Sequence, residues 1–178
     1  MPDADLRAGL IGIVRDVQSI PYSWPGPPTA EAVERDGSGT CAGKHALARI
    51  RIRSLGLTAN RLMVTGPLAP RVWPDLHDAA GDLLEVHECL SVETPWAGPL
   101  LVDVTWPPAA IRAGLPGTTG WDGGGDMVCA VDPVAAYAVA DEAFRSQKEL
   151  LRSRLYTADD RRRRDRILAE IATRAAML

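Results

Sequence analysis

The N-terminal part of the chain has the apolar spacing of helices. Between residues 6 and 20, apolar side chains recur every three or four positions, which places them on one helical face, and Pro21 ends this helix. Thr29 is suited to cap a second, short helix that runs through residue 34. The alanine, leucine and arginine content of residues 41–55, with Gly56 just beyond, predicts a third helix.

The middle of the chain has the composition of strands. Residues 61–65 form a short strand candidate, and residues 82–93 and 100–106 flank a turn at 94–99, as expected for an antiparallel hairpin. The proline-containing stretch 66–81 is expected to be a loop, and 107–125 an irregular crossing rich in proline and glycine. Two further helices are expected near residues 134–155 and 158–178. These elements together predict an α+β fold.

Length and composition favour a single domain. The chain has 178 residues, of which 46% are hydrophobic, enough for a substantial core. We expect one domain over residues 1–178, with its core at about 6–108 and a C-terminal helical part at about 130–178.

Charge and cysteine content point to a cytoplasmic protein without a nucleic-acid or membrane partner. The formal net charge is −3, and the arginine run at residues 161–164 is interspersed with acidic residues, which is typical of a solvated helix face. No apolar run approaches the roughly 18 residues that a membrane span requires. The N-terminal segment, with Asp3 and Arg7, lacks signal-peptide features. Three cysteines are few and odd in number, so reduced thiols are expected.

Cys41 stands where a thiol becomes reactive. It opens the third predicted helix directly after the glycine-containing turn DGSGT, residues 36–40. A helix N-terminus favours the thiolate because unpaired N–H groups and the positive end of the dipole face it. The backbone N–H of Cys41 is also placed to donate to the oxyanion of an acyl intermediate.

His87 and Asp103 lie on the two strands of the predicted hairpin. If the hairpin turns near Pro95 and Trp96, the two side chains fall opposite each other on one face, close enough for an imidazole–carboxylate hydrogen bond. Cys41 packed across that face would complete a triad of nucleophile, base and orienting acid.

The motifs GSGTCAGKHAL, RSLGLTANRLMV, EVHECLSVE and LLVDVTWPP, in this order, resemble those of the transglutaminase-like superfamily of papain-like cysteine enzymes. The resemblance covers roughly residues 6–108. It implies a papain-like fold, in which a helix bearing Cys41 packs on an antiparallel sheet bearing His87 and Asp103 and C-terminal helices close one side. The implied roles are Cys41 as nucleophile, His87 as general base and acid, and Asp103 as the orienting residue.

Two other features of the family bear on this chain. Its members commonly add an upstream polar or aromatic donor to the oxyanion hole, for which Trp24 and Tyr22 are both candidates. After the histidine the family often has a small residue and an aromatic one, whereas this chain has Glu88 and Cys89. This departure bears on which acyl substrate the protein takes more than on the assignment of the triad.

The expected activity is acyl transfer through a thioester. Water as the acceptor would make the protein an amidase or peptidase, and an amine would make it an amide-forming acyltransferase. We expect a small-molecule or peptide substrate and no cofactor. The apolar face of the last helix, which carries Ile167, Ile171, Ala175 and Leu178, is expected to dock on the core or on a second copy of the chain.

The alternative is a non-catalytic zinc-binding or interaction domain on the same fold. Cys41 and His45 stand four apart on one helix face, and His87 and Cys89 stand two apart on one strand face, so the four side chains are candidate ligands of a tetrahedral zinc site. Asp103 would then support His87 from outside the ligand set. Without a metal, Cys89 and Cys129 are interpreted as structural residues.

Overall fold

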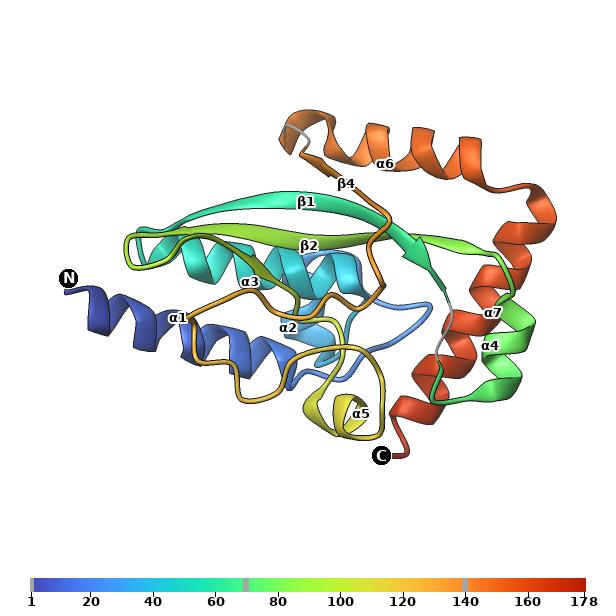
Figure 1. Cartoon of the computed structure of the whole chain (residues 1–178), viewed down its shortest axis with the longest axis horizontal. Helices are drawn as coiled ribbons and strands as arrows, with labels where there is room; N and C mark the ends of the chain where they lie inside the picture. The colour runs from blue at the N-terminus through green and yellow to red at the C-terminus, as the bar shows by residue number, and fades with distance from the viewer. Residues whose placement is uncertain (1, 69–70, 139–140) are drawn as a thin grey trace.

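The computed structural model describes residues 2–68, 71–138 and 141–178. It is an α+β fold built on a four-stranded antiparallel sheet in the order β3-β2-β1-β4 (Figure 1). The strands are β1 (Thr58–Pro67), β2 (Leu84–Thr94), β3 (Gly98–Val102) and β4 (Ala135–Ala138). The helices are α1 (Asp3–Gln18), α2 (Ala30–Asp36), α3 (Cys41–Ser54), α4 (Pro74–Ala80), α5 (Pro108–Arg112), α6 (Asp141–Leu155) and α7 (Ala158–Ala175).

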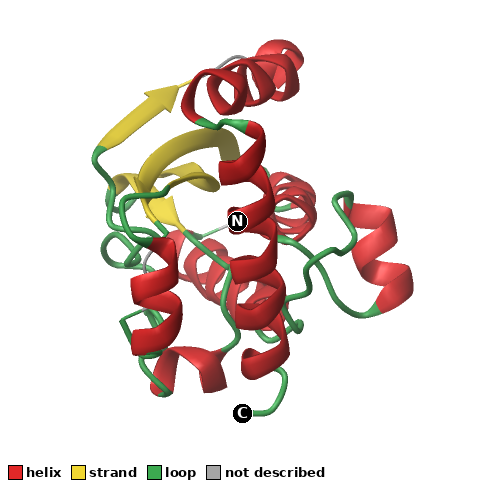
Figure 2. Ribbon diagram, turned by 90° about the vertical axis from the view of Figure 1, so that its right-hand side faces the viewer, coloured by secondary structure: helices red, strands yellow, loops and turns green. Residues whose placement is uncertain are grey.

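The long strands β1 and β2 form the centre of the sheet, and α3 lies along both of them (Figure 1). Apolar residues of α1 and α3, among them Leu10, Leu47 and Ile52, are fully or almost fully buried with Leu90 of β2 and Val102 of β3. Helix α7 packs against α4 at the other end of the molecule from the N-terminus. Figure 2 shows the strands gathered at one edge of the molecule with the helices beside and below them. Burial of these apolar stripes is the main force that fixes α3 on the sheet.

The hairpin of β2 and β3 turns where the sequence predicts, but its register does not place His87 directly opposite Asp103. Leu90 pairs with Val102 and Thr94 with Gly98. Extension of this register past the end of β3 places Asp103 across from Cys89, so Asp103 is diagonal to His87 on the same face. The prediction of directly opposed residues was wrong by two positions, although the shared face was correct.

Three elements were missed from the sequence: α4, β4, and α5, which lies in the crossing expected to be irregular. The proline-containing stretch expected to be a loop contains α4, in which Pro74 occupies the first turn, where a missing N–H does no harm, and Leu76 and Ala80 are buried. Residues 135–138, expected to be helical, form β4 on the edge of β1. The open edge of β1 outweighs the helix propensity of this alanine-rich segment, so the C-terminal part is not wholly helical. The helix expected from residue 134 begins at Asp141, and residues 139–140 lie outside the described residues.

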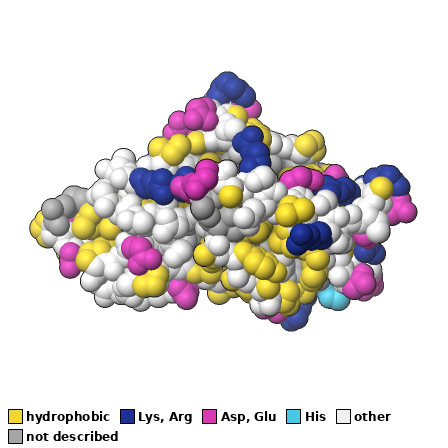
Figure 3. Space-filling view, turned by 90° about the horizontal axis from the view of Figure 1, so that it is seen from above, with side chains coloured by type: hydrophobic (Ala, Val, Ile, Leu, Met, Phe, Trp, Pro, Cys, Tyr) yellow, Lys and Arg dark blue, Asp and Glu magenta, His cyan; other side chains and the backbone are white. Residues whose placement is uncertain are grey.

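Basic and acidic side chains are interspersed on the surface seen from above, next to a cluster of hydrophobic ones (Figure 3). Exposed hydrophobic residues around β4 include Val134 and Tyr137. Within the described residues, no helix combines the length and the apolar composition that a membrane crossing requires.

Candidate active site

Cys41 is the first residue of α3, as the sequence predicts. Thr40 caps the helix through its side chain, which accepts a hydrogen bond from the N–H of Gly43 at 3.3 Å. Glycine is required at this position because a Cβ on Gly43 would lie 2.3 Å from the carbonyl oxygen of Pro27. The close approach of the proline-containing loop to the helix N-terminus therefore fixes where the Cys41 thiol points.

His87 of β2 and Asp103, just beyond β3, form a buried hydrogen-bonded pair. Nε2 of His87 lies 2.7 Å from Oδ2 of Asp103, and each residue is 3% exposed. Asp103 also accepts hydrogen bonds from the backbone N–H groups of Thr105 (2.9 Å, to Oδ1) and Ala130 (2.8 Å, to Oδ2). Burial raises the pKa of Asp103, but the positive charge and hydrogen bond of His87 outweigh it and hold this pKa well below its usual value. Asp103 is thus an ionised, immobile acceptor.

Cys41 and His87 line the same cavity. Burial opposes ionisation of the thiol, yet interaction with the imidazole of His87 and the charge of Lys148 lower the pKa of Cys41 to about 7. Burial likewise disfavours the imidazolium, but Asp103 raises the pKa of His87 well above its usual value. The structure therefore brings Cys41, His87 and Asp103 together in the order of a triad, in a state that favours a thiolate beside an imidazolium.

His45 connects the helix of Cys41 to the segment of Asp103. The ring is fully buried, with Nδ1 2.7 Å from the carbonyl oxygen of Cys41, while the N–H of Val104 donates to Nε2 at 3.1 Å. Because Nε2 accepts, Nδ1 carries the proton and donates to Cys41. Both ring nitrogens of His45 are therefore engaged in positioning the backbone.

Lys44 is a fully buried cation one residue before His45. Its Nζ donates to three backbone carbonyls, those of Gln18 (3.1 Å), Ile20 (2.7 Å) and Thr105 (2.9 Å). Burial lowers the pKa of Lys44 to about 7, against the opposing charge of Asp103. Lys44 thereby joins the end of α1, the helix of Cys41 and the strand exit that carries Asp103.

A cavity of about 510 Å³ opens onto the triad. Cys41 and His87 contribute to its wall, and most of the remaining wall is apolar, including Leu68 and Leu115 from loops and Leu168 and Ile171 from α7. The apolar face of α7, predicted to dock on the core or on a second copy, thus lines the cavity.

The two candidate oxyanion donors occupy different places. Tyr22 is 5% exposed, lines the cavity with Cys41, and packs on Trp106 with ring centroids 4.6 Å apart. Trp24 lies under the guanidinium of Arg164, 4.7 Å from its ring centroid, and is not among the described residues that line the cavity. Placement therefore favours Tyr22.

Cys129 is a site residue that sequence reasoning missed. It lines the cavity, and its sulfur lies within 4.8 Å of a ligand atom of His87 and of Asp103. Interaction with the thiol of Cys89 is the main cause that lowers the pKa of Cys129 and raises that of Cys89. Cys129 stands in an irregular segment far along the chain from the triad motifs, so no local pattern marks it. The sequence analysis treated Cys129 as a purely structural residue, but the structure places it, like Cys41, beside the imidazole of His87 in the cavity wall.

The four zinc ligands considered from the sequence do not converge on one ion. Both nitrogens of His45 are occupied by backbone groups, and Cys89 lies behind Cys129 with no exposed surface. Among the described residues, the group whose ligand atoms lie close enough for one metal ion is instead His87, Asp103 and Cys129.

No protein-family model matches this sequence, and no curated protein matches it at a significant level.

Proposed function

We propose that this protein is a papain-like cysteine enzyme of transglutaminase-like type, which transfers acyl groups through a thioester on Cys41. The observation that carries the proposal is the hydrogen bond of Asp103 to the buried imidazole of His87, with Cys41 and His87 in the wall of one cavity. A nucleophile at a helix N-terminus, a base, and a carboxylate that orients the base are the parts that this chemistry needs.

In the first half-reaction, the thiolate of Cys41 attacks the carbonyl carbon of an ester or amide. The N–H of Cys41 and the hydroxyl of Tyr22 donate to the oxyanion, and the imidazolium of His87 gives its proton to the leaving group. The leaving group departs as an alcohol or amine, and the acyl group remains on sulfur.

In the second half-reaction, neutral His87 takes a proton from water or an amine as that molecule attacks the thioester. The products are a carboxylic acid or an amide, and the thiolate–imidazolium pair is restored. Asp103 holds Nε2 of His87 throughout, which leaves Nδ1 for the exchange of the proton.

The cavity favours a small acyl donor with an apolar body. Its volume suits a small molecule or a short peptide segment, and apolar residues supply most of its wall. The indole N–H of Trp106, which lines this wall, is buried without a hydrogen-bond partner among the described residues. A carbonyl group of the bound substrate would satisfy this donor.

The test is direct detection of the acyl-enzyme. The protein is incubated with a panel of activated apolar acyl esters and then analysed by intact mass and peptide mapping. We expect one acyl group on Cys41, which is lost on addition of hydroxylamine. The Cys129→Ser variant is the matched control and should still form the adduct, whereas Cys41→Ser should not.

Acylation of Cys129 in place of Cys41, or no acylation in any member of the panel, would contradict the proposal. The same reactions with and without an added amine distinguish the two outcomes of the second half-reaction. Free acid alone, unaffected by amine, would exclude the acyltransferase version and leave the hydrolase.

A further inference from the structure

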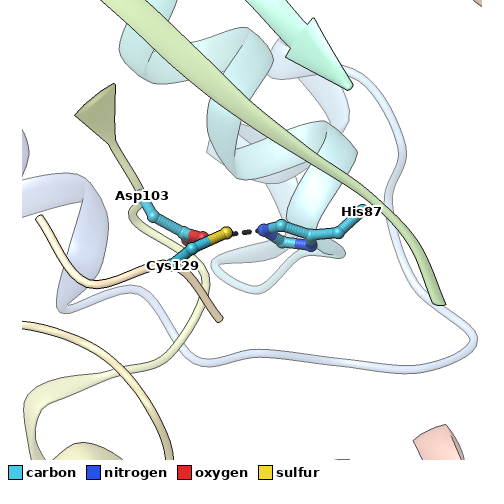
Figure 4. Close-up of side chains that lie close together, drawn as sticks. All are labelled: His87, Asp103 and Cys129. Carbon is cyan, nitrogen blue, oxygen red and sulfur yellow. Dashed lines mark hydrogen bonds and ion pairs between the residues drawn. The ribbon is translucent and has the colours of Figure 1, made fainter. Parts of the chain in front are cut away.

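Three side chains from separate segments converge beside the thiol of Cys41. His87 comes from β2, Asp103 from the exit of β3, and Cys129 from the segment that leads to β4 (Figure 4). One ligand atom of each residue lies within 4.8 Å of the ligand atoms of the other two. The three residues are between 3% and 6% exposed, so these polar groups meet in an interior that excludes most water.

This donor set has the chemistry of a zinc site. An imidazole nitrogen, a carboxylate oxygen and a thiolate sulfur are the three ligand types that Zn²⁺ takes in proteins, at about 2.0–2.3 Å. Three protein ligands leave a fourth coordination position, and the cavity that His87 and Cys129 line supplies room for a water molecule or a substrate atom there.

The segments that carry the ligands are already tied together. The N–H of Ala130, adjacent to Cys129, donates to Oδ2 of Asp103, and the N–H of Thr105 donates to Oδ1. The N–H of Val134, further along the same segment, donates to the carbonyl of Thr65 on β1 at 2.8 Å. Because these bonds hold the backbone, binding requires a small movement of three side chains and no rearrangement of the fold.

We propose that His87, Asp103 and Cys129 form a binding site for Zn²⁺, and that the zinc-bound state excludes the triad. Coordination replaces the hydrogen bond between Nε2 of His87 and Asp103, and it releases the Nε2 proton of His87 and the thiol proton of Cys129. His87 then keeps only its Nδ1 proton, as a neutral metal-bound imidazole that is a far weaker acid than the imidazolium and has no free lone pair to act as a base. The binding site stands on its own geometry, whereas the block of acyl transfer rests on the proposed function.

The first experiment measures zinc affinity on the full chain, without substrate, by competition with a chromophoric chelator. We expect one equivalent of Zn²⁺ to bind, with an affinity at least about 100-fold weaker in Cys129→Ser, since even outer-shell changes cost 10–100-fold. Cys89→Ser is the matched control, because it alters the neighbouring thiol, and it should stay within about threefold of the parent. The absence of saturable binding in the parent, or an unchanged affinity in Cys129→Ser, would overturn the site.

A spectrum of the parent protein tests the zinc site without relying on a variant that could fail to fold. Cobalt(II) bound to the parent protein should show a thiolate-to-metal charge-transfer band, since Co²⁺ occupies the same kind of site. This band should persist in Cys41→Ser. A band that Cys41→Ser abolishes would place the metal on the nucleophile instead and contradict the proposed ligand set.

Zinc should also slow the alkylation of Cys41 by iodoacetamide in a Cys89→Ser background, at least about tenfold at saturation. If zinc binds with the expected ligands but leaves this rate unchanged, the claim that zinc blocks the triad is refuted, whereas the binding site is retained. If the protein fails to be acylated in the absence of zinc, that result counts only against the proposed function.

Discussion

Nδ1 of His45 donates to the carbonyl oxygen of Cys41 at 2.7 Å, and Nε2 of the same ring accepts the N–H of Val104, the residue after Asp103. One imidazole thus spans the first turn of α3 and the exit of β3. Its position fixes the distance between the segments that carry the nucleophile and the acid.

Loss of this link should loosen the site. We expect His45→Leu to leave the N–H of Val104 buried without a partner and to lower the free energy of unfolding by about 2 kcal/mol. The alkylation of Cys41 at pH 7 should slow as well, because the thiol and the imidazole of His87 no longer hold their relative position. Urea unfolding and iodoacetamide kinetics measure the two effects. Gln147→Leu, an exposed position on α6, is the control and should change neither.

The pH dependence of alkylation should report the thiol of Cys41. In a Cys129→Ser background, the rate with iodoacetamide should reach half its maximum near pH 7, the value to which His87 and Lys148 lower the pKa of Cys41 against burial. His87→Ala should move the midpoint upward, towards the ordinary range of a thiol. A midpoint that is ordinary in both proteins would leave the catalytic interpretation without its physical basis.

The two aromatic candidates for the oxyanion hole should separate experimentally. Tyr22→Phe should slow acylation of Cys41 by about 10²–10³-fold, the usual cost of one oxyanion donor. Trp24→Phe should have little effect, because Trp24 packs under Arg164 outside the cavity wall. Single-turnover acylation rates provide the comparison, and equal slowing in both variants would argue against the assignment to Tyr22.

The free energy of unfolding should contain a pH-dependent contribution from His87. His87 has a folded-state pKa well above 6.5, so its stabilising effect is complete below pH 6.5 and is lost as the pH rises through the folded value. The folded-state pKa of Cys41 lies below that of the free thiol, 9.0, so its contribution is present above pH 9 and is lost as the pH falls through about 7. The two trends oppose each other in the parent.

In Cys41→Ser/Cys129→Ser the two thiol trends are removed, whereas Lys44, with a pKa lowered to about 7, still adds a trend opposite to that of His87. Comparison with the same variant carrying His87→Gln isolates His87. We expect the difference in the free energy of unfolding between the two variants to fall between pH 7 and 9, by at most about 1.4 kcal/mol per pH unit. Urea unfolding of both at three pH values measures the slope, and a difference that does not change with pH would show that His87 does not titrate as described.

The buried ion pair of Arg164 and Glu85 should hold α7 on the cavity. Both side chains are about 5% exposed and form two hydrogen bonds. Arg164→Leu leaves the carboxylate of Glu85 with one ion-pair partner among the described residues, Arg152 at 3.7 Å, and should cost about 3 kcal/mol of unfolding free energy. Arg162→Leu, exposed on the same helix, should cost less than about 0.5 kcal/mol. Thermal and urea unfolding of the two variants decide between these values.

The parts of the site that were predicted are those that local patterns encode. The helix that begins at Cys41 follows from the turn before it, and the shared face of His87 and Asp103 follows from strand alternation in one hairpin. Their diagonal offset was not predicted, because it depends on the length of the turn and on where β3 ends. A register shift of two positions between β2 and β3 leaves each side chain on the same face of the sheet and changes only which residues lie directly opposite each other.

The parts that were missed depend on contacts between distant segments. Cys129 reaches His87 only because its segment is bound to Asp103 through Ala130 and leads into β4, which pairs with β1. Helix α4 exists because α7 covers it. Neither contact has a signature within a window of ten or fifteen residues.

The three carbonyls bound by Lys44 belong to two segments, residues 18–20 and residue 105, which lie far apart in the sequence. During synthesis, the segment with Cys41 emerges before the segments with His87 and Asp103. The side chain of Lys44 can enter the interior only when both acceptor segments are in place to receive it. The surroundings that lower the pKa of Cys41 are therefore assembled only after segments well beyond Cys41 have been synthesised.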